Sequence, residues 1–230
     1  MQTLTRCMAM VVALGALVSC AGLDLPGSSQ SAFEAGLGLF NQGKYEEAIP
    51  HFVKATEIDP EVGRAYLYLG RSQLNLRRWS DALASLRTAY LLSPEETKQE
   101  TVQILVDALI GAGSASLAQG NLGESVSLFK EALALAPESE QVKKLLVDAL
   151  IQSGTQLLSQ GHTSEAVSAF QEATQFAPKN FRAYIGLARS LWQSGDALKA
   201  LPAAHRALQL APNSSEALSA FTLLGQLQSR

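Results

Sequence analysis

The chain has 230 residues, of which 47% are hydrophobic and 17% are charged, and this balance excludes intrinsic disorder. Its 18 basic and 21 acidic residues give a net charge of −3, which excludes the basic footprint of a nucleic-acid-binding protein. Its two cysteines are too few for a disulfide framework or a multi-cysteine metal site. Aromatic residues make up only 7%, so the apolar share comes largely from Ala, Leu and Val. This composition favours an all-α protein with small, close-packed contacts.

The N-terminal segment has the pattern of a secretory signal peptide. Residues 1–6 carry one basic group, and the apolar run Cys7–Val18 follows. A run of about a dozen residues is too short to span about 30 Å of hydrocarbon, but it is typical of a signal sequence. The next residues read Leu-Val-Ser-Cys-Ala, which resembles the lipobox of bacterial lipoproteins. We therefore expect residues 1–19 to be removed and Cys20 to be lipidated; the alternative is an ordinary secretory signal cleaved nearby, with Cys20 incidental.

The lipobox resemblance implies a place in the cell. Mature bacterial lipoproteins generally carry three acyl chains, and more than one chain is needed for stable anchoring. In proteobacterial lipoproteins, Ala rather than Asp after the cysteine directs the protein to the outer membrane, and Ala21 occupies that position here. The resemblance therefore implies a lipid-anchored protein of the cell envelope, on the periplasmic face of the outer membrane. Residues 20–30 are then the lipidated cysteine and a flexible tether containing Pro26 and Gly27.

The rest of the chain is built from an internal repeat. Five prolines recur at spacings of 34, 43, 41 and 34 residues, namely Pro60, Pro94, Pro137, Pro178 and Pro212. Upstream of each proline lies a similar series of residue sizes: Ala48-Phe52-Ala55, Ala82-Leu86-Ala89, Ser125-Phe129-Ala132, Ala166-Phe170-Ala173 and Ala200-Ala204-Ala207. Further upstream, a second small position is held by Gly36, Gly70, Gly113, Gly154 and Ala188. The turn between this position and the series before the proline is held by Gly43, Arg77, Gly120, Gly161 and Gly195.

This pattern resembles the tetratricopeptide repeat, in which each 34-residue unit forms two antiparallel helices. A Gly or Ala lets two helices approach closely, and a closing proline cannot continue the preceding helix. One hairpin cannot bury its own apolar faces, so stacked neighbours supply the core. We therefore predict an all-α solenoid of five repeats over residues 31–214 and a capping helix over 215–230, with Leu218, Phe221 and Leu224 on its apolar stripe.

The third and fourth repeats exceed the 34-residue pitch, by nine residues before Pro137 and seven before Pro178. Apolar residues keep helical spacing through the second insertion, from Val142 to Leu157. Residues 93–96, Ser-Pro-Glu-Glu, match a capping box with proline at the first helical position. We therefore predict that the first helices of repeats three and four are each about two turns longer than usual.

In the repeat family the first helices line a concave groove that receives peptides or partner helices. The equivalent apolar positions here are Phe33, Leu67, Ile110, Ile151 and Ile185 in one row and Phe40, Leu74, Leu117, Leu158 and Trp192 in another. Two pairs of arginines, each seven residues apart and so on one helix face, are Arg64 with Arg71 and Arg182 with Arg189.

The resemblance implies an apolar groove with basic ends, suited to an amphipathic helix or to an extended segment that bears carboxylates. The alternative is that the apolar rows are core between repeats and that the arginines are a solvated face. Chaperone-binding relatives use a two-carboxylate clamp, which needs Lys and Asn where this chain has Phe33 and Leu37. We therefore do not expect it to recognise chaperone C-termini.

The sequence gives little support to catalysis. The histidines His51, His162 and His205 are far apart and lack partners at metal-ligand spacing. The acids Asp107 and Asp148 are equivalent copies in related helices rather than a facing pair. No phosphate loop, nucleophile elbow or dinucleotide fingerprint is present. We therefore expect no enzyme, no catalytic residue, no cofactor and no metal.

The combined expectation is a lipid-anchored scaffold that holds other envelope proteins together through a peptide or helix in its groove. Lipoproteins of this build serve pilus and secretion systems, barrel assembly and cell-wall machinery, and the sequence does not choose among them. An alternative is a structural protein that self-assembles into homo-oligomers. A third reading, an enzyme or small-ligand binder, rests only on the pockets that repeat solenoids sometimes enclose.

Overall fold

The computed structural model describes residues 27–228, a range that contains eleven α-helices and no strand. In chain order they are α1 (Ser29–Asn41), α2 (Tyr45–Ile58), α3 (Gly63–Asn75), α4 (Trp79–Leu92), α5 (Glu95–Ala118), α6 (Leu122–Leu135), α7 (Glu140–Ser159), α8 (Thr163–Phe176), α9 (Phe181–Gln193), α10 (Ala197–Leu210) and α11 (Ser215–Gln228). The predicted signal peptide (1–19), Cys20 and most of the tether lie outside the described residues.

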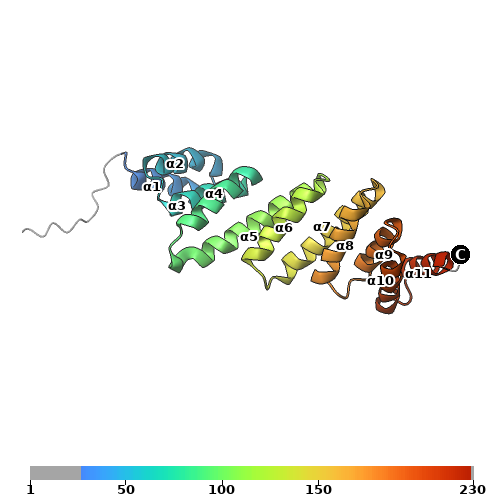
Figure 1. Cartoon of the computed structure of the whole chain (residues 1–230). Coiled ribbons are helices and arrows are strands. Elements are labelled where there is room, and N and C mark those ends of the chain that lie inside the picture. Colours follow the sequence, from blue (N-terminus) through green and yellow to red (C-terminus); the bar gives the residue numbers. More distant parts are fainter. Residues whose placement is uncertain (1–26, 229–230) are drawn as a thin grey trace, which may run out of the picture.

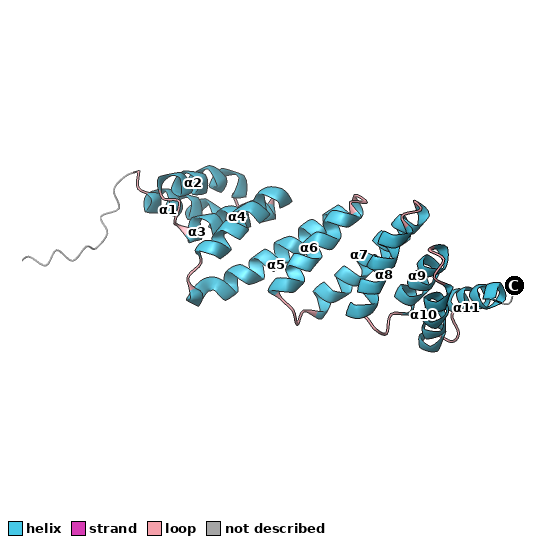
Figure 2. Ribbon diagram, in the orientation of Figure 1, coloured by secondary structure: helices cyan, strands magenta, loops and turns pink. Residues whose placement is uncertain are grey.

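The helices form an elongated stack of five hairpins, α1/α2 to α9/α10, with α11 at the C-terminal end (Figure 1). Short loops join consecutive helices (Figure 2), and each hairpin contacts the next along the chain. This arrangement confirms the prediction of an all-α solenoid of five repeats followed by a capping helix. Because every hairpin packs mainly on its neighbours, the core is a row of interfaces rather than one central cluster.

Inside the first four hairpins a glycine of the first helix faces a large residue of the second. A Cβ atom added to Gly113 would lie 2.7 Å from the Phe129 ring, and one added to Gly154 would lie 2.8 Å from the Phe170 ring. Only a hydrogen atom fits at these crossings. The fifth repeat has equal sizes at this crossing, since Ala188 replaces the glycine and Ala204 replaces the large residue, and both are fully buried.

The turns inside four hairpins are glycines with φ between 76° and 87°: Gly43, Gly120, Gly161 and Gly195. At the same place in the second repeat Arg77 has a φ of 56°, so it adopts the left-handed conformation without being glycine. An L-residue in this region costs roughly 1–2 kcal/mol. The sequence pattern places all five turns correctly, including the one where the usual residue is missing.

The helices α5 and α7 have 24 and 20 residues, whereas α1, α3 and α9 have 13 each. The extra residues are thus helical, about three turns in α5 and two in α7. The predicted capping box at residues 93–96 is wrong, because α5 begins at Glu95 and has no side-chain cap bond. The Ser93 hydroxyl instead donates to the Ala89 carbonyl, which it reaches at 2.7 Å, so it closes α4 rather than opening α5.

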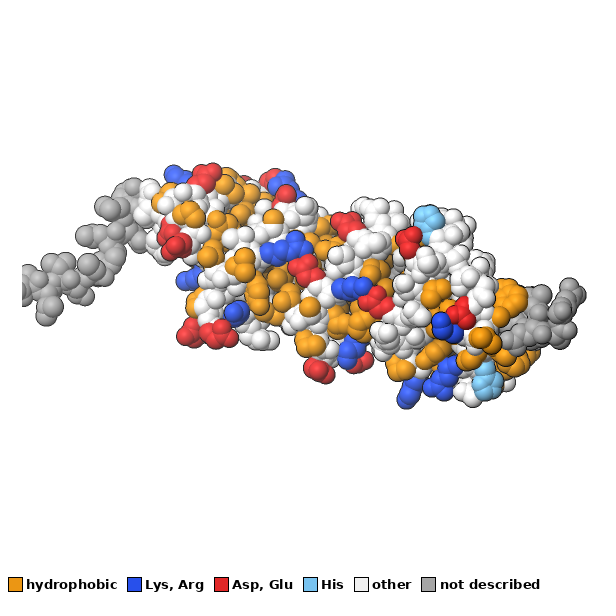
Figure 3. All heavy atoms as spheres, in the orientation of Figure 1, with side chains coloured by type: hydrophobic (Ala, Val, Ile, Leu, Met, Phe, Trp, Pro, Cys, Tyr) orange, Lys and Arg blue, Asp and Glu red, His pale blue; other side chains and the backbone are white. Residues whose placement is uncertain are grey.

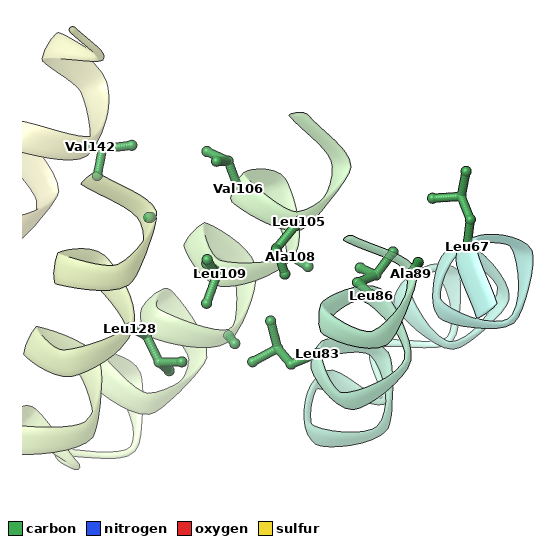
Figure 4. Close-up of a cluster of buried hydrophobic side chains, with 12 residues drawn as sticks. Leu67, Leu83, Leu86, Ala89, Leu105, Val106, Ala108, Leu109, Leu128 and Val142 are labelled. Atoms are coloured by element: carbon green, nitrogen blue, oxygen red, sulfur yellow. The ribbon is translucent and has the colours of Figure 1, made fainter. Parts of the chain in front are cut away.

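Within the described residues, α5 is the one helix that is long and apolar enough to cross a membrane by length and composition. Core helices of soluble proteins meet the same criteria. In this fold the side chains of Leu105, Ala108 and Leu109 are almost completely buried against α4, α6 and α7 (Figure 4). Its apolar residues therefore serve the stack.

The capping helix α11 packs on α9 and α10. Its buried contact is Ala217, which is fully enclosed, and Phe221 is half-buried against the cluster of Ala203 and Ala204. The predicted stripe is wrong at Leu218, whose exposed fraction is 53%, and the side chain of Leu224 lies outside the described part of the chain. The contact face is shifted by one residue because α11 docks through the small Ala217 next to Ala207.

Candidate functional site

The residues predicted to line the groove all lie on the first helices α1, α3, α5, α7 and α9. Three of them, Phe33, Leu67 and Ile185, are buried, with exposed fractions of 4%, 8% and 4%. The other apolar positions are half-buried: Phe40, Leu74, Ile110, Leu117, Ile151, Leu158 and Trp192. The rows are therefore partly core and partly groove. The buried members pack the hairpins, and the half-buried members form a partly accessible apolar surface.

The arginines of α3 rest on aromatic rings. The guanidinium carbon of Arg64 lies 5.2 Å from the centre of the Phe33 ring. That of Arg71 lies 5.2 Å from the Phe40 ring and 5.0 Å from the Tyr68 ring. Tyr68 in turn meets Phe33 and Phe40 edge-on, at centroid distances of 5.6 and 5.2 Å. Stacking of this kind holds a guanidinium in place and leaves its N–H groups free to donate.

The arginines of α9 repeat this spacing at the other end of the stack. Arg182 lies 5.8 Å from the Phe181 ring, and both Arg182 and Arg189 are exposed. Seven residues along a helix correspond to about 10.5 Å, so the Cα atoms of each pair lie about that far apart on one face. Across residues 27–228, none of the four groove arginines forms an ion pair with a carboxylate.

Two acids occupy the equivalent row in the middle of the stack. Asp107 on α5 and Asp148 on α7 stand where α3 and α9 have Arg64 and Arg182, and both are exposed. Asp107 accepts a hydrogen bond from the Gln103 side-chain amide at 3.2 Å. Neither acid is in an ion pair within the described range. The charge on the first helices thus runs basic, acidic, acidic, basic from α3 to α9.

Two cations on the second helices, by contrast, bind carboxylates of the next repeat. Arg87 of α4 makes a two-pronged contact with Glu131 of α6, at 2.8 and 2.6 Å. Lys130 of α6 lies 2.7 Å from Glu172 of α8. The hydrogen bonds with Glu131 hold the pKa of Arg87 above its ordinary value, despite partial burial that opposes the shift. Neighbouring blue and red side chains over α6 and α8 are visible in Figure 3.

A cleft of about 560 Å³ opens between α3, the end of α4 and the start of α5. Its walls include Arg64, Leu67 and Tyr68 from α3, Leu92 from α4, and Thr97 and Glu100 from α5. Sequence reasoning placed Arg64 and Leu67 in the groove but missed the cleft. The available signal was the lengthening of α5, because the residues that close the cleft lie in its additional turns.

The histidines do not meet in space. His51 lies within α2, His162 precedes α8 and His205 lies within α10. His162 approaches Glu165 at 3.6 Å, and the His205 ring lies 6.0 Å from the Phe221 ring. Over residues 27–228 no three His, Cys, Asp or Glu side chains gather into a group that could hold a metal ion. The expectation of no metal and no cofactor stays a prediction.

Comparison with known proteins addresses the fold. The tetratricopeptide repeat family model matches residues 33–97 and 151–215, together more than half of the chain. A tetratricopeptide repeat protein from Bacteroides fragilis has a similar structure, with a TM-score of 0.60 and 14% identity over 87% of this chain and 99% of that protein. At this identity the likeness concerns the fold alone.

Two relatives share sequence over about half of the chain. Mouse protein O-mannosyl-transferase TMTC3 is 30% identical over 112 residues, and the wheat Hsp70-Hsp90 organizing protein is 29% identical over 108 residues. The matches cover 46% and 47% of this chain but only 12% and 17% of those proteins. Tetratricopeptide repeats are generally non-enzymatic scaffolds for protein–protein interaction, and the fold implies this role here. On the combined evidence of its repeats, its fold and the matching family model, the chain belongs to the tetratricopeptide repeat family.

Proposed function

We propose that the chain is a lipid-anchored adaptor of the bacterial cell envelope, which holds a partner protein in the groove formed by its first helices. The observation that carries the groove assignment is the contrast in charge pairing. Arg71 and Arg189 occupy equivalent positions on α3 and α9 without a carboxylate partner among the described residues, whereas Arg87 and Lys130 on second helices are paired. Arginines without a carboxylate partner, of which Arg71 is held by two aromatic rings and Arg189 is exposed, match a partner that supplies carboxylates.

The partner is a segment of another envelope protein, bound as an amphipathic helix or an extended peptide. The half-buried row of Leu74, Leu117 and Leu158 offers apolar contact, and the arginine pairs offer anchoring points at both ends. The central acids Asp107 and Asp148 favour basic residues in the middle of the segment. The charge order therefore favours a partner that is acidic where it meets the arginine pairs and basic where it meets Asp107 and Asp148.

The groove is tested by reversing charge on one face at a time. Arg71→Glu with Arg189→Glu should weaken capture of envelope proteins by the tagged, detergent-solubilised chain at least tenfold, because two carboxylate contacts become repulsions. Lys54→Glu with Arg206→Glu is the matched control, since it makes the same change in charge at exposed positions of α2 and α10. Equal capture by both double variants would contradict the groove assignment.

The anchor has a separate test. The proposed lipid attachment at Cys20 rests on the apolar run before it and the Leu-Val-Ser-Cys-Ala sequence around it. Cells grown with a radiolabelled or clickable fatty acid should label the wild-type chain but not Cys20→Ala. Persistent labelling of the variant would overturn the lipoprotein proposal.

Sedimentation of the mature chain tests the alternative of a homo-oligomer. The adaptor proposal expects a monomer, whereas a stable oligomer would favour self-assembly.

A further inference from the structure

The additional turns of α5 build one wall of the cleft beside α3. The helices α1, α3 and α9 begin at the first position of their repeats, and the equivalent position in the third repeat is Val106. The helix α5 begins eleven residues earlier, at Glu95. Residues Thr97, Glu100 and Thr101 of this extension face α3 across the 560 Å³ cleft. A first helix of ordinary length would leave this end of the groove open.

The cleft has an apolar floor and a charged rim. Leu67 is buried at its base, and Tyr68 and Leu92 are half-buried beside it. The rim carries the exposed carboxylates of Glu61 and Glu100, and neither is in an ion pair within the described residues. The Thr101 hydroxyl is already satisfied, since it lies 2.9 Å from that of Ser93 and donates to the Thr97 carbonyl. The side chains of the cleft that remain available to a ligand are thus the apolar ones of its floor and the charged ones of its rim.

The charge of the rim indicates the occupant. Two carboxylates stand against one cation, Arg64, whose guanidinium also lies over the Phe33 ring of α1. The local balance is therefore acidic, in contrast to the basic surface around Arg71. A volume of this size lies within the range of ligand pockets, roughly 300–1,000 Å³. It accepts one large apolar side chain together with the backbone on either side.

We propose that this cleft is a specificity subsite that takes a bulky apolar side chain of the partner segment, with a lysine or arginine next to it facing Glu61 and Glu100. The inference rests on the proposed function, since it assumes that a partner segment enters the groove. It adds that the lengthening of α5 determines which partner sequence enters the cleft. That sequence has a basic residue beside a large apolar residue. One short segment can make both contacts, because its apolar side chain covers the floor and its basic residue faces the two carboxylates.

The test selects decapeptides from a random display library on the full chain in detergent. Wild-type protein should enrich peptides in which Leu, Ile, Met or Phe lies beside Lys or Arg. Glu61→Lys with Glu100→Lys should replace the basic residue with Asp or Glu. Glu95→Lys with Glu96→Lys is the matched control, because these exposed acids lie on α5 with Glu100 but do not line the cleft, and it should keep the wild-type preference.

A second variant fills the cleft without touching the core. Thr97 is exposed on α5 and lines the cleft, whereas Gln99 is exposed on the same helix and does not. Thr97→Trp should weaken binding of the selected peptide at least tenfold, since the apolar side chain loses its contact area. Gln99→Trp should leave binding unchanged. Circular dichroism of both variants checks that α5 remains helical.

The outcomes separate the two proposals. Peptides that lose binding with Arg71→Glu and Arg189→Glu but show no basic–apolar pair would overturn the cleft proposal and leave the groove in place. A basic–apolar pair that survives Glu61→Lys with Glu100→Lys would also overturn the cleft proposal. Failure to enrich any peptide would contradict both proposals together.

Discussion

The two faces of the stack use charge differently. On the second helices, the ion pairs Arg87–Glu131 and Lys130–Glu172 join residues 44 and 42 positions apart in the chain and connect neighbouring repeats. On the first helices, Arg71 and Arg189 keep their donors uncommitted within the described residues. Under the adaptor proposal, the ion pairs between repeats help to fix the geometry of the solenoid, and the arginines of the first helices are available to a partner.

The crossing between the two faces gives the largest expected effect on stability. Phe129 is fully buried and fills the space that Gly113 leaves open. Phe129→Ala should reduce the free energy of unfolding by about 3–5 kcal/mol, because it removes a core ring and leaves a cavity. Phe176, with an exposed fraction of 36%, is the matched control, and its replacement by Ala should cost far less. Urea titrations followed by circular dichroism measure both, and equal losses would contradict the assignment of Phe129 to the crossing.

The buried hydroxyl of Ser125 on α6 should reduce the stability of the fold. The Ser125 hydroxyl is buried without a hydrogen-bond partner in the described structure, and its equivalents are fully buried alanines, Ala48, Ala82, Ala166 and Ala200. Ser125→Ala should therefore raise the free energy of unfolding by about 1–2 kcal/mol. The control Ser127→Ala, at an exposed position of α6, should change it by less than about 0.5 kcal/mol. A loss of stability in Ser125→Ala would show that the hydroxyl has a partner.

The turn that joins the two faces of the second repeat should be improved by glycine. Arg77→Gly relieves the left-handed conformation, worth roughly 1–2 kcal/mol, but adds about 0.5–1 kcal/mol of backbone entropy to the unfolded chain. We expect a net gain of about 0.5–1 kcal/mol in thermal or urea unfolding. The reverse change, Gly161→Ala, should destabilise the fourth repeat by a similar amount. A loss of stability in Arg77→Gly together with a gain in Gly161→Ala would refute this explanation of the turn.

Disruption of one ion pair on the second helices gives the smallest effect. Glu131→Gln should cost less than about 1 kcal/mol, because both partners are more than a third exposed and water screens the pair. The loss should shrink in 1 M salt, where the screening length falls to about 3 Å. Glu57→Gln on α2 removes the same charge from a residue without an ion pair and should be nearly neutral. A loss independent of salt would argue against an electrostatic link between repeats.

Much of the fold follows from short-range pattern. The series that ends at Pro137 or Pro178 places small and large residues at fixed helical spacing, so the crossings of Gly113 with Phe129 and Gly154 with Phe170 are predictable without any model of the stack. The same logic identifies Arg77 as a turn residue, because its neighbours define the place where glycine stands elsewhere.

The features that sequence reasoning missed depend on neighbouring repeats. The stacking of Arg71 on Phe40 and Tyr68 and the cleft beside α5 arise only when one hairpin docks on the next. The start of α5 was misplaced because Pro94 adopts an extended conformation as the residue before the helix, with ψ of 157°. In α11 a one-residue difference in contact face, from Leu218 to Ala217, depends on how closely two helices approach.

Site-specific photo-crosslinking in cells tests the division between the two faces most directly. A photoreactive residue at Thr155, which stands on α7 at the position equivalent to Arg71 and Arg189, should capture an envelope protein. The same residue at Ser127, exposed on second helix α6, should capture none. Capture from Ser127 but not from Thr155 would contradict the account, because the partner would then bind the face that carries the ion pairs between repeats.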